Sequence, residues 1–467
     1  MAKIPFIGTY EGRSKEAGAL RCVNLYPDMS EGGVTLKLFG TPGLTSWASL
    51  GASPVRGFHV VGDVLHCVAG KKYYTINTAG VATVNAVELT TSSGTVYFSD
   101  NGLQVVVVDG TFGYYYTIAT GVLAKIVDAD FPVPGSVTYL DSYILVHAVN
   151  TGNMHGSSSY AAQTYAALDY LNAEAQSDNL VRVIALHQSV FLLGSHSLQV
   201  AYHVGGTGFP FSVNPAMTTN TGCLSAATVC RTGDAGNILM WLAQNKQGTG
   251  YVVRTDGDTP VSVSNPELEH LWGEYSTLAD ATAYAYREDG HTFYVISFPT
   301  AGKTWAYDLG VGAWHERSSG LAGGRHKGEK YAYHFGKHLV SDATVGEIYE
   351  MDLNTYTDAG APILRTLVMP HLSDVEKRHT YSQMQVVIAA GVGIPVGQGV
   401  DPQAMLSWST DYGHTYGNEH YASMGAQGNF GTRLIWHKLG RSFLRTFKLT
   451  ISDPVKIVLL YAALLTS

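Results

Sequence analysis

The segment 55-VRGFHVVGDVLHCVAGKKYYTI contains three short runs of β-branched and aromatic residues, separated by Gly-Asp and Gly-Lys turns. The same pattern returns as 95-TVYFSDNGLQVVVVDGTFGYYYTI and as 183-VIALHQSVFLLGSHSLQVAYHV, and it recurs about every forty to fifty residues as far as Asp352. Short strands repeated at this period are typical of β-propeller blades, because one four-stranded unit cannot bury both of its faces and must stack on its neighbours in a ring.

The repeats leave residues at both ends of the chain. A propeller of about six or seven blades uses about 300 of the 467 residues. We therefore predict an all-β protein with an N-terminal arm over residues 1–50, a β-propeller over 51–354 and a C-terminal β-sandwich over 355–467. Composition agrees, because 52 Gly, 29 Tyr and a charged fraction of 14% suit tight turns and half-buried strands rather than exposed helices.

Two segments depart from the repeat. In the arm, a strand candidate over Val34–Phe39 is followed by 41-TPGL, which predicts a turn where Pro presets φ and Gly43 supplies a positive φ. Between Thr151 and Asn179 the repeat gives way to a polar, Ala-rich stretch, for which we expect a surface insertion with a short helix over Tyr165–Ala175. Surface insertions of this kind are where contacts with partners concentrate.

The pattern changes again after residue 354. Strand candidates are separated by turn signals at intervals typical of a β-sandwich. The six candidates are Leu364–Met369, Tyr381–Ala389, Ala404–Ser409, Arg433–Lys438, Thr446–Ile451 and Val455–Tyr461.

The charge balance argues against a nucleic-acid-binding surface. The chain carries 29 Lys and Arg against 37 Asp and Glu, for a formal charge of −8, and its basic residues are scattered. Phosphate binding requires clustered cations that displace condensed counterions. A net negative chain would instead let DNA pass close by without sticking to it.

No membrane span or secretory signal is expected. The longest apolar run, Ile457–Leu465, is less than half of the roughly 20 residues that a spanning helix needs, and we interpret it as a buried terminal strand. The amino terminus lacks the apolar core of a signal sequence, which predicts assembly in a cytoplasm. The cysteines show no metal-ligand spacing, so we expect reduced, mostly buried thiols. They are Cys22, Cys67, Cys223 and Cys230.

The sharpest local motif is 409-STDYGHTY, which fits the Asp-box pattern Ser-x-Asp-x-Gly-x-Thr-aromatic. In such a turn we expect Asp411 to accept hydrogen bonds from backbone N–H groups, and Gly413 to adopt a conformation that other residues avoid. The aromatic side chain packs beneath the turn. The predicted role is structural bracing, and its residues are Ser409, Asp411, Gly413, Thr415 and Tyr416.

Catalytic, cofactor and metal sites are not predicted. The sequence AGKT at residues 301–304 resembles the end of a phosphate-binding loop, but Ser297 stands where the leading Gly belongs and the segment joins two strands. Several histidines are close together in the sequence, without a His-Glu-x-x-His pattern or a carboxylate set that would complete a metal site. They are His326, His334 and His338, and also His371 and His379.

Together these motifs resemble a known family. The matching features are 24-NLYP, 41-TPGL, 168-LDYLNAEAQSDNLVRV with 191-FLLGSHSLQVAY, and 407-SWSTDYGHTYG with 436-WHKLGRSFLRTFKLTISDPVKI. They follow the order found in the packaged DNA stabilisation proteins, which are the tail hubs of short-tailed bacteriophages. One departure is 151-TGNMHGSSSYAAQTY, where such proteins often carry a Ser-Asp-Leu and Trp-containing stretch.

The resemblance implies a structural protein of the virion tail, with no enzymatic activity and no cofactor. Such a hub, or nozzle, assembles as a homohexameric ring below the portal and the head-to-tail adaptor. It carries tail spikes or fibres outside and a needle or plug below. Its role is to close the vertex so that packaged DNA is retained, and to form part of the DNA ejection channel.

Two other functions stay open at this point. Propellers and sandwiches both offer platforms for sugars, and Tyr and Trp are plentiful, so the chain is alternatively a carbohydrate- or receptor-binding tail component. A glycan-cleaving enzyme is the third hypothesis. Ring formation with an open axial channel would favour the hub. Saturable glycan binding by an isolated monomer would favour the carbohydrate- or receptor-binding component, and loss of turnover on replacing a carboxylate pair would favour the glycan-cleaving enzyme.

Overall fold

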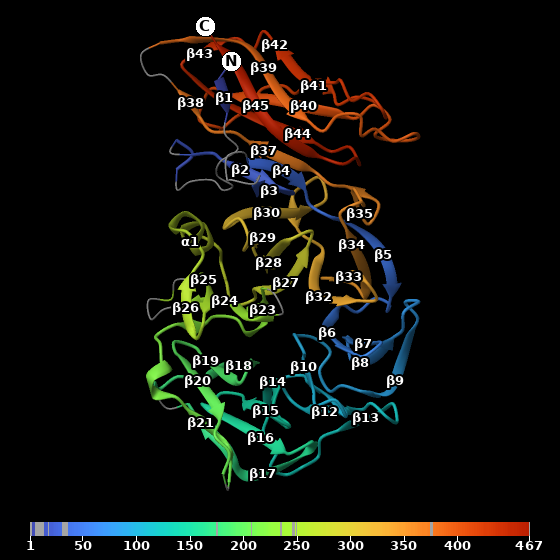
Figure 1. The fold of residues 1–467 in the computed structure, drawn as a ribbon, viewed down its shortest axis with the longest axis vertical. Coiled ribbons are helices and arrows are strands. Elements are labelled where there is room, and N and C mark those ends of the chain that lie inside the picture. The colour runs from blue at the N-terminus through green and yellow to red at the C-terminus, as the bar shows by residue number, and fades with distance from the viewer. Residues whose placement is uncertain are drawn as a thin grey trace.

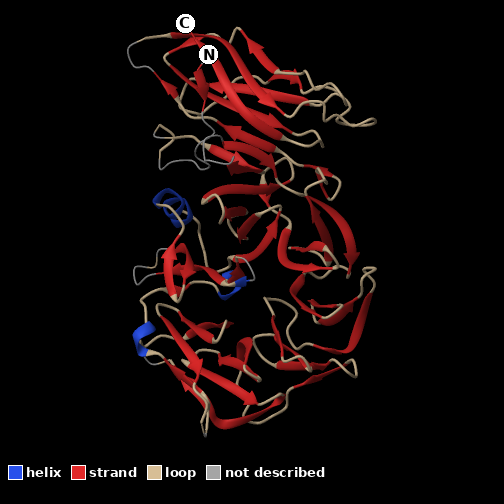
Figure 2. Cartoon of the chain, viewed as in Figure 1, coloured by secondary structure: helices blue, strands red, loops and turns tan. Residues whose placement is uncertain are grey.

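Short antiparallel sheets make up nearly all of the structure (Figure 1, Figure 2). The computed structural model describes residues 2–4, 14–16, 18–29, 36–173, 176–206, 208–233, 236–244, 248, 250–373 and 377–466. Within these residues the sheets form a ring of blades and, beside the ring, a body of two stacked sheets that holds both ends of the chain. The all-β prediction is confirmed.

The ring of described residues contains seven blades, within the predicted range of six or seven. The first four are β6 (Val55–Val61) to β9 (Ala82–Glu88), β10 (Tyr97–Asp100) to β13 (Val122–Lys125), β14 (Pro134–Leu140) to β17 (Ala161–Asn172), and β18 (Leu180–Leu186) to β21 (Phe211–Val213). The last three are β22 (Gly222–Cys223) to β26 (Thr259–Ser262), β27 (Thr282–Glu288) to β30 (Ala313–Ser319), and β32 (Gly328–His334) to β34 (Glu347–Asp352) with β5 (Gly43–Ser49).

Strand β5 closes the ring. It comes from the start of the chain and pairs antiparallel with β34 as the outer strand of the seventh blade, with Gly43 opposite Asp352 and Ser49 opposite Glu347. The ring therefore cannot open without breaking this pairing. Although the sequence prediction assigns residues 1–50 to an arm, the structure places residues 43–49 in the propeller, because their partner strand lies some 300 residues further along the chain.

Gly43 itself differs from its prediction. It lies in β5 and does not have a positive φ. A Cβ at this position would lie 2.3 Å from the carbonyl oxygen of Thr355. Close approach of another backbone, and not a left-handed turn, is therefore the reason that Gly is needed here.

The propeller core lies between neighbouring blades. Strand β11 (Gln104–Val108) is buried over its whole length because blades cover both of its faces, which explains its continuous run of valines. At the closure, Leu339 and Ile348 of the seventh blade pack with Val55 and Leu65 of the first. Burial of such side chains contributes about 1.5 to 3 kcal/mol each. Apolar contact therefore holds the first blade against the seventh, in addition to the pairing of β5 within the seventh blade.

The predicted helix over Tyr165–Ala175 is wrong. Residues 161–172 form β17, the outer strand of the third blade, which pairs with β16 (Asn153–Ser158). Residues 174 and 175 lie outside the described part of the chain. The Ala-rich composition favours a helix locally, but pairing with a preformed strand edge overrides so weak a preference.

The C-terminal body is a β-sandwich. One sheet has the order β3-β4-β45-β39-β42 and the other contains β2-β37-β44-β40-β41. Each of the six strand candidates coincides with a strand in these sheets. The bounds of the strands named in these two sheet orders are β2 (Arg21–Val23), β3 (Leu25–Met29), β4 (Leu36–Gly40), β37 (Arg365–Val368), β39 (His379–Ile388), β40 (Gln403–Ser409), β41 (His420–Ser423), β42 (Leu434–His437), β44 (Leu444–Ile451) and β45 (Val458–Thr466).

Much of the segment 1–50, which the sequence predicts to be an N-terminal arm, is therefore part of the sandwich. Strands β2, β3 and β4 belong to its two sheets, and β1 (Ala2–Ile4) pairs with β45. Residues 34 and 35 of the strand candidate Val34–Phe39 lie outside the described residues, and residues 36–39 are in β4. Strand β45 lies between β4 and β39, which agrees with the buried terminal strand expected from its sequence.

Propeller and sandwich share one sheet. Val23 of β2 pairs in parallel with Glu316 of β30, the outer strand of the sixth blade. An eleven-stranded sheet thus runs from the innermost strand of that blade to the far edge of the sandwich. Helices are few, and α1 (Pro266–Gly273) covers the blade edge with Leu268 and Trp272 fully buried. No helix in the described ranges is long and apolar enough to cross a membrane.

Candidate functional site

The five Asp-box residues lie in one turn that begins at Ser409, the last residue of β40. The Ser409 hydroxyl accepts hydrogen bonds from the N–H groups of Asp411, at 3.1 Å, and Gly413, at 2.9 Å. The Asp411 carboxylate accepts the N–H of Thr415, at 2.9 Å, and its hydroxyl, at 2.5 Å. Gly413 has φ +84°, and the Lys448 ammonium lies 4.5 Å from the centre of the Tyr416 ring. The bracing that the motif predicts is thus shared between Ser409 and Asp411.

Residues 15 and 16 of the N-terminal arm lie against this turn and against His371, which packs on it. The His414 ring lies 3.1 Å from the Glu16 carboxylate. The Nε2 atom of His371 lies 2.5 Å from the Lys15 carbonyl oxygen, and the His371 ring meets the Tyr412 ring edge-on at 5.4 Å. Sequence reasoning missed this contact, because residues 15 and 371 show no signal of mutual proximity.

The two carboxylates at this contact are strongly acidic. Hydrogen bonds from the side chains of Ser409 and Thr415 hold the pKa of Asp411 well below its usual range. The Ser14 hydroxyl and His414 lower the pKa of Glu16 to about 2. Both groups are therefore ionised acceptors at neutral pH, which suits bracing and is the wrong state for a general acid.

Asn24 connects the propeller, the sandwich and the strand that closes the ring. It is 2% exposed and has φ +54°, which Asn tolerates better than most residues. Its side-chain amide donates to the carbonyl oxygens of Ser318, at 3.0 Å, and Leu364, at 2.9 Å, and accepts the Ser318 N–H at 2.9 Å. Its backbone N–H donates to Glu316 and its carbonyl accepts from Thr41. These bonds explain the Asn of the 24-NLYP sequence.

Glu316 carries the charge at the same junction. Its carboxylate is 4% exposed and accepts two hydrogen bonds from Arg21, at 2.8 and 3.0 Å. Lys303, the Lys of the AGKT sequence, lies 3.0 Å away. Burial alone would raise the pKa of Glu316, but Arg21 and Lys303 together hold it below its usual value. A buried carboxylate with two cations joins the sixth blade to β2.

A cavity of about 350 Å³ lies on this junction. Glu288, Asp289 and Asp352 line it from the propeller, and Arg365 and Lys456 line it from the sandwich. Burial raises the pKa of Glu288 to about 7 and lowers that of the 1%-exposed Arg365 to about 10. The two bodies thus face each other with opposite charge, which favours one relative orientation.

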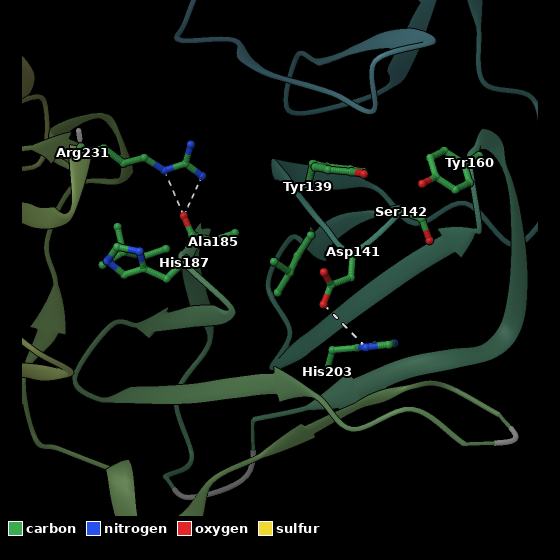
Figure 3. A pocket seen from close by; sticks show the side chains of 11 residues that line it. Tyr139, Asp141, Ser142, Tyr160, Ala185, His187, His203 and Arg231 are labelled. Atoms are coloured by element: carbon green, nitrogen blue, oxygen red, sulfur yellow. Dashed lines mark hydrogen bonds and ion pairs between the residues drawn. The ribbon is translucent and has the colours of Figure 1, made fainter.

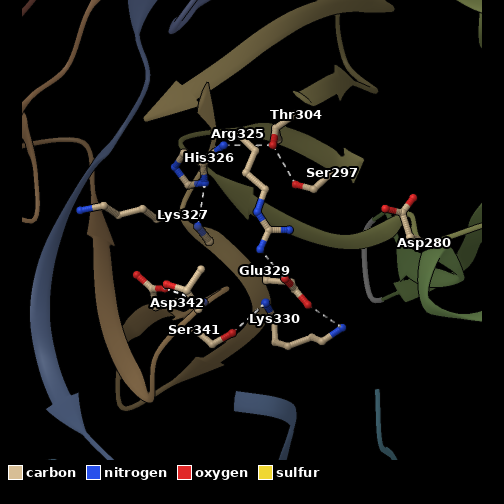
Figure 4. Close-up of polar contacts among 12 residues, drawn as sticks. Asp280, Ser297, Thr304, Arg325, His326, Lys327, Glu329, Lys330, Ser341 and Asp342 are labelled. Atoms are coloured by element: carbon tan, nitrogen blue, oxygen red, sulfur yellow. Dashed lines mark hydrogen bonds and ion pairs between the residues drawn. The ribbon is translucent and has the colours of Figure 1, made fainter. Parts of the chain in front are cut away.

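The centre of the propeller is crossed by side chains. The Arg182 guanidinium of the fourth blade lies 3.8 Å from the centre of the Tyr97 ring of the second blade. Lys330 of the seventh blade donates to the Thr95 hydroxyl, just before the second blade, at 3.2 Å. The Lys330 ammonium also lies 3.6 Å from the carboxylate of Glu329, its neighbour in the same strand (Figure 4). The Arg182–Tyr97 and Lys330–Thr95 contacts join blades that are not neighbours, so these two contacts run across the middle of the ring.

The four cysteines are free thiols. Cys22, Cys67 and Cys223 are buried free thiols and Cys230 is partly buried. Burial raises the pKa of Cys22, Cys223 and Cys230 to about 12, so these thiols are protonated and weakly reactive. Across the described part of the chain, no group of three or more His, Cys, Asp or Glu side chains could hold a metal ion.

Comparisons with known proteins place both bodies in one family. Residues 3–356 match the family model described as the β-propeller of bacteriophage P22 Gp10, and residues 365–464 match the β-sandwich of the same protein. A search of curated proteins returned no match.

The similarity to solved structures is weak. The chain is similar to the designed Ika8 protein (11% identity, TM-score 0.38, 66% of this chain and 99% of that one). It is also similar to YCF48 bound to a D1 peptide, with 11% identity and a TM-score of 0.41 over 67% of this chain and 99% of that one. The N-terminal domain of Nup159 is similar with 8% identity and a TM-score of 0.41 over 71% of this chain and 98% of that one.

Proposed function

Because this chain belongs to the bacteriophage P22 Gp10 family of structural phage tail proteins, matched by its propeller and by its sandwich, we propose that it is the hub of the tail. In this role it forms a ring, a hexamer by the family resemblance, below the portal and the head-to-tail adaptor. The ring closes the vertex after packaging, retains the DNA, and later forms part of the ejection channel. The match over both bodies is the observation that carries the proposal.

The crossed propeller centre supports a channel between subunits. Arg182 meets Tyr97 at 3.8 Å and Lys330 meets Thr95 at 3.2 Å, so the axis of a single propeller does not admit a DNA duplex. DNA would instead pass along the axis of a ring of copies. With a formal charge of −8 and scattered basic residues, such a lining would not hold the phosphate backbone.

The junction supports a mechanical role. Packaged DNA pushes on the structure that closes the vertex, and a closure made of two loosely tethered bodies would yield at the tether. Here one eleven-stranded sheet continues from the sixth blade into the sandwich, and Asn24 and Glu316 bond across the point where they meet. A continuous sheet transmits load through backbone hydrogen bonds instead of through a flexible linker.

The remaining partners follow from the same role. The needle or plug would lie below the ring, and spikes or fibres outside it. Assembly would take place in the host cytoplasm before the particle is complete. The role requires large interfaces, since obligate assemblies typically bury about 2,000 Å² or more, and it requires no covalent chemistry.

The test uses particles that lack the protein. A phage with a stop codon early in this reading frame is grown with and without a plasmid that supplies the intact chain, and filled and empty heads are counted by electron microscopy. Without the chain, heads should package DNA and then lose it, and the plasmid should restore filled, infectious particles. Stable filled heads without the chain would overturn the proposal.

A second experiment addresses assembly directly. Purified protein is imaged by negative stain, alone and mixed with portal and adaptor. Rings with an open centre, or rings formed only on the portal complex, are expected. Monomers that bind neither protein would contradict the hub role.

A further inference from the structure

A cavity of about 900 Å³ opens on the propeller where hairpin turns of the third and fourth blades come together (Figure 3). Nothing in the proposed hub role uses it. Two exposed turns of the third blade and one of the fourth supply most of its polar lining, and Arg231 of the fifth blade lies at its edge. The principal lining residues are Tyr139, Asp141, Ser142, Tyr160, His187 and His203.

Left-handed backbone positions are concentrated around this cavity. Eleven residues other than Gly have a positive φ in the described chain, and four of them line this one cavity. They are Asp141 (+47°), Ser142 (+77°), Tyr160 (+53°) and His187 (+53°). Hairpin turns of this kind favour Asn, Asp and Gly, and a bulkier residue such as Tyr160 is held there against its own backbone preference. Strain that is retained at several positions of one cavity is characteristic of ligand-binding sites.

The two turns of the third blade are bonded to each other. The Tyr160 N–H donates to the Ser142 carbonyl at 2.9 Å, and the hydroxyls of Ser142 and Ser159 lie 2.8 Å apart. The Asp141 carboxylate lies 3.6 Å from the His203 ring, which packs on Phe211 at 5.3 Å. The two turns that carry Asp141, Ser142 and Tyr160 are therefore held together before any ligand arrives, which reduces the entropic cost of binding.

The exposed groups match a ligand with many hydroxyls and no charge. Tyr160 is 56% exposed and, with Tyr139, presents an aromatic face and a phenol hydroxyl. Asp141 accepts hydrogen bonds, while Ser142, His187 and His203 both donate and accept. We propose that this cavity binds a neutral saccharide, with the tyrosine rings against the sugar face and Asp141 and His203 on its hydroxyls.

Other ligand classes fit the lining less well. The Nε and Nη2 atoms of Arg231 both donate to the Ala185 carbonyl, at 2.9 and 2.6 Å, and the Asp141 carboxylate in the same lining repels a phosphate or sulfate. One carboxylate is too few for a hard cation. A purely apolar ligand would desolvate the Asp141 carboxylate without giving it a hydrogen bond.

The experiment is saturation-transfer NMR on the purified full-length protein. The probes are methyl glycosides of glucose, galactose, mannose, rhamnose and N-acetylglucosamine, with a sulfated heparin disaccharide as the charged comparator. At least one neutral glycoside should bind saturably, and Tyr160→Ala and Asp141→Ala should each weaken that binding by at least tenfold. Tyr421→Ala, a change to a 64%-exposed tyrosine on the sandwich, is the matched control and should bind as the wild type does.

A further variant separates binding from folding. Ser142→Gly removes the strain at φ +77° and the bond to Ser159, so it should raise the melting temperature while weakening glycoside binding. Three results would each overturn the proposal: no neutral glycoside binds, only the sulfated sugar binds, or Tyr160→Ala and Asp141→Ala bind as tightly as Tyr421→Ala.

Discussion

Arg21 and Glu316 form a paired contact, at 2.8 and 3.0 Å, between the first sandwich strand β2 and the outer strand β30 of the sixth blade. The two residues are separated by 295 positions in the chain. The contact flanks the only parallel pairing between these strands in the described residues, Val23 with Glu316. Relative placement of propeller and sandwich therefore depends on few residues, and each can be tested alone.

Arg21→Ala should lower the free energy of unfolding by about 1 to 2 kcal/mol, because the buried Glu316 carboxylate loses two hydrogen bonds and keeps only Lys303. Urea denaturation measures the change. The matched control is Lys337→Ala, which removes a half-exposed ion pair with Glu350 inside one blade and should cost less than about 1 kcal/mol. Equal effects of the two variants would show that Glu316 does not depend on Arg21.

Asn24→Ala should destabilise the protein by about 2 to 4 kcal/mol, since it removes four side-chain hydrogen bonds and places Ala at φ +54°. Asn150→Ala is the control, because Asn150 has φ +61° and is exposed, so only the backbone cost of about 1 to 2 kcal/mol applies. Thermal unfolding of both variants gives the comparison. A loss no larger than that of Asn150→Ala would remove Asn24 from the junction.

Glu288 should make stability fall as the pH rises from about 4.5 to about 7. Burial raises its pKa in the folded protein to about 7, so folding favours the protonated form, and ionisation above the unfolded value opposes folding. Below pH 4.5 the group is protonated in both states, and above pH 7 the penalty is constant. Glu288→Gln removes this dependence. The measurement is the melting temperature of wild type minus variant across pH 4 to 8, and a flat difference would contradict the assignment.

Asp411→Ala should lower the melting temperature of the sandwich without affecting any activity, because the Thr415 N–H and hydroxyl lose their acceptor. The pKa of Asp411 is lowered in the folded state, so the wild-type advantage is present above the ordinary carboxyl pKa of about 4 and is lost as the pH falls below it. Asp411→Asn keeps the shape without the charge and should lie between the two. Unchanged stability with a lost glycan-cleaving activity would refute the bracing role.

Truncation after Asp453 should give insoluble or proteolytically nicked protein. It removes β45, which pairs with β39 on one side and with β4 and β1 on the other. The five buried Val, Ile and Leu side chains that the truncation removes contribute about 1.5 to 3 kcal/mol each, and together they are comparable to the usual net stability of a domain, about 5 to 15 kcal/mol. Limited proteolysis of the soluble fraction is the readout, and a chain ending at Leu464 serves as the control that should remain folded.

Local patterns in the sequence were enough to predict the strands and their kind of assembly. The repeat of short β-branched runs predicted a propeller, the six candidates after residue 354 coincide with sandwich strands, and the Asp-box spacing from Ser409 to Tyr416 identified a turn. These features succeed because a strand's alternation and a turn's hydrogen bonds involve residues a few positions apart. The same reasoning failed over residues 165–172, where a strand edge outside the segment decided the conformation.

The sequence by itself determined an all-β chain of blades followed by a sandwich, together with its acidic balance. Only the tertiary structure decided that β5 closes the seventh blade, that β2 joins β30, that Asn24 bonds to Ser318 and Leu364, and that Asp141 and Tyr160 share a cavity with His203. Most of these contacts join residues tens to hundreds of positions apart. Their formation depends on how blades pack around a ring, and that packing energy is a property of the whole chain, which no local window of sequence contains.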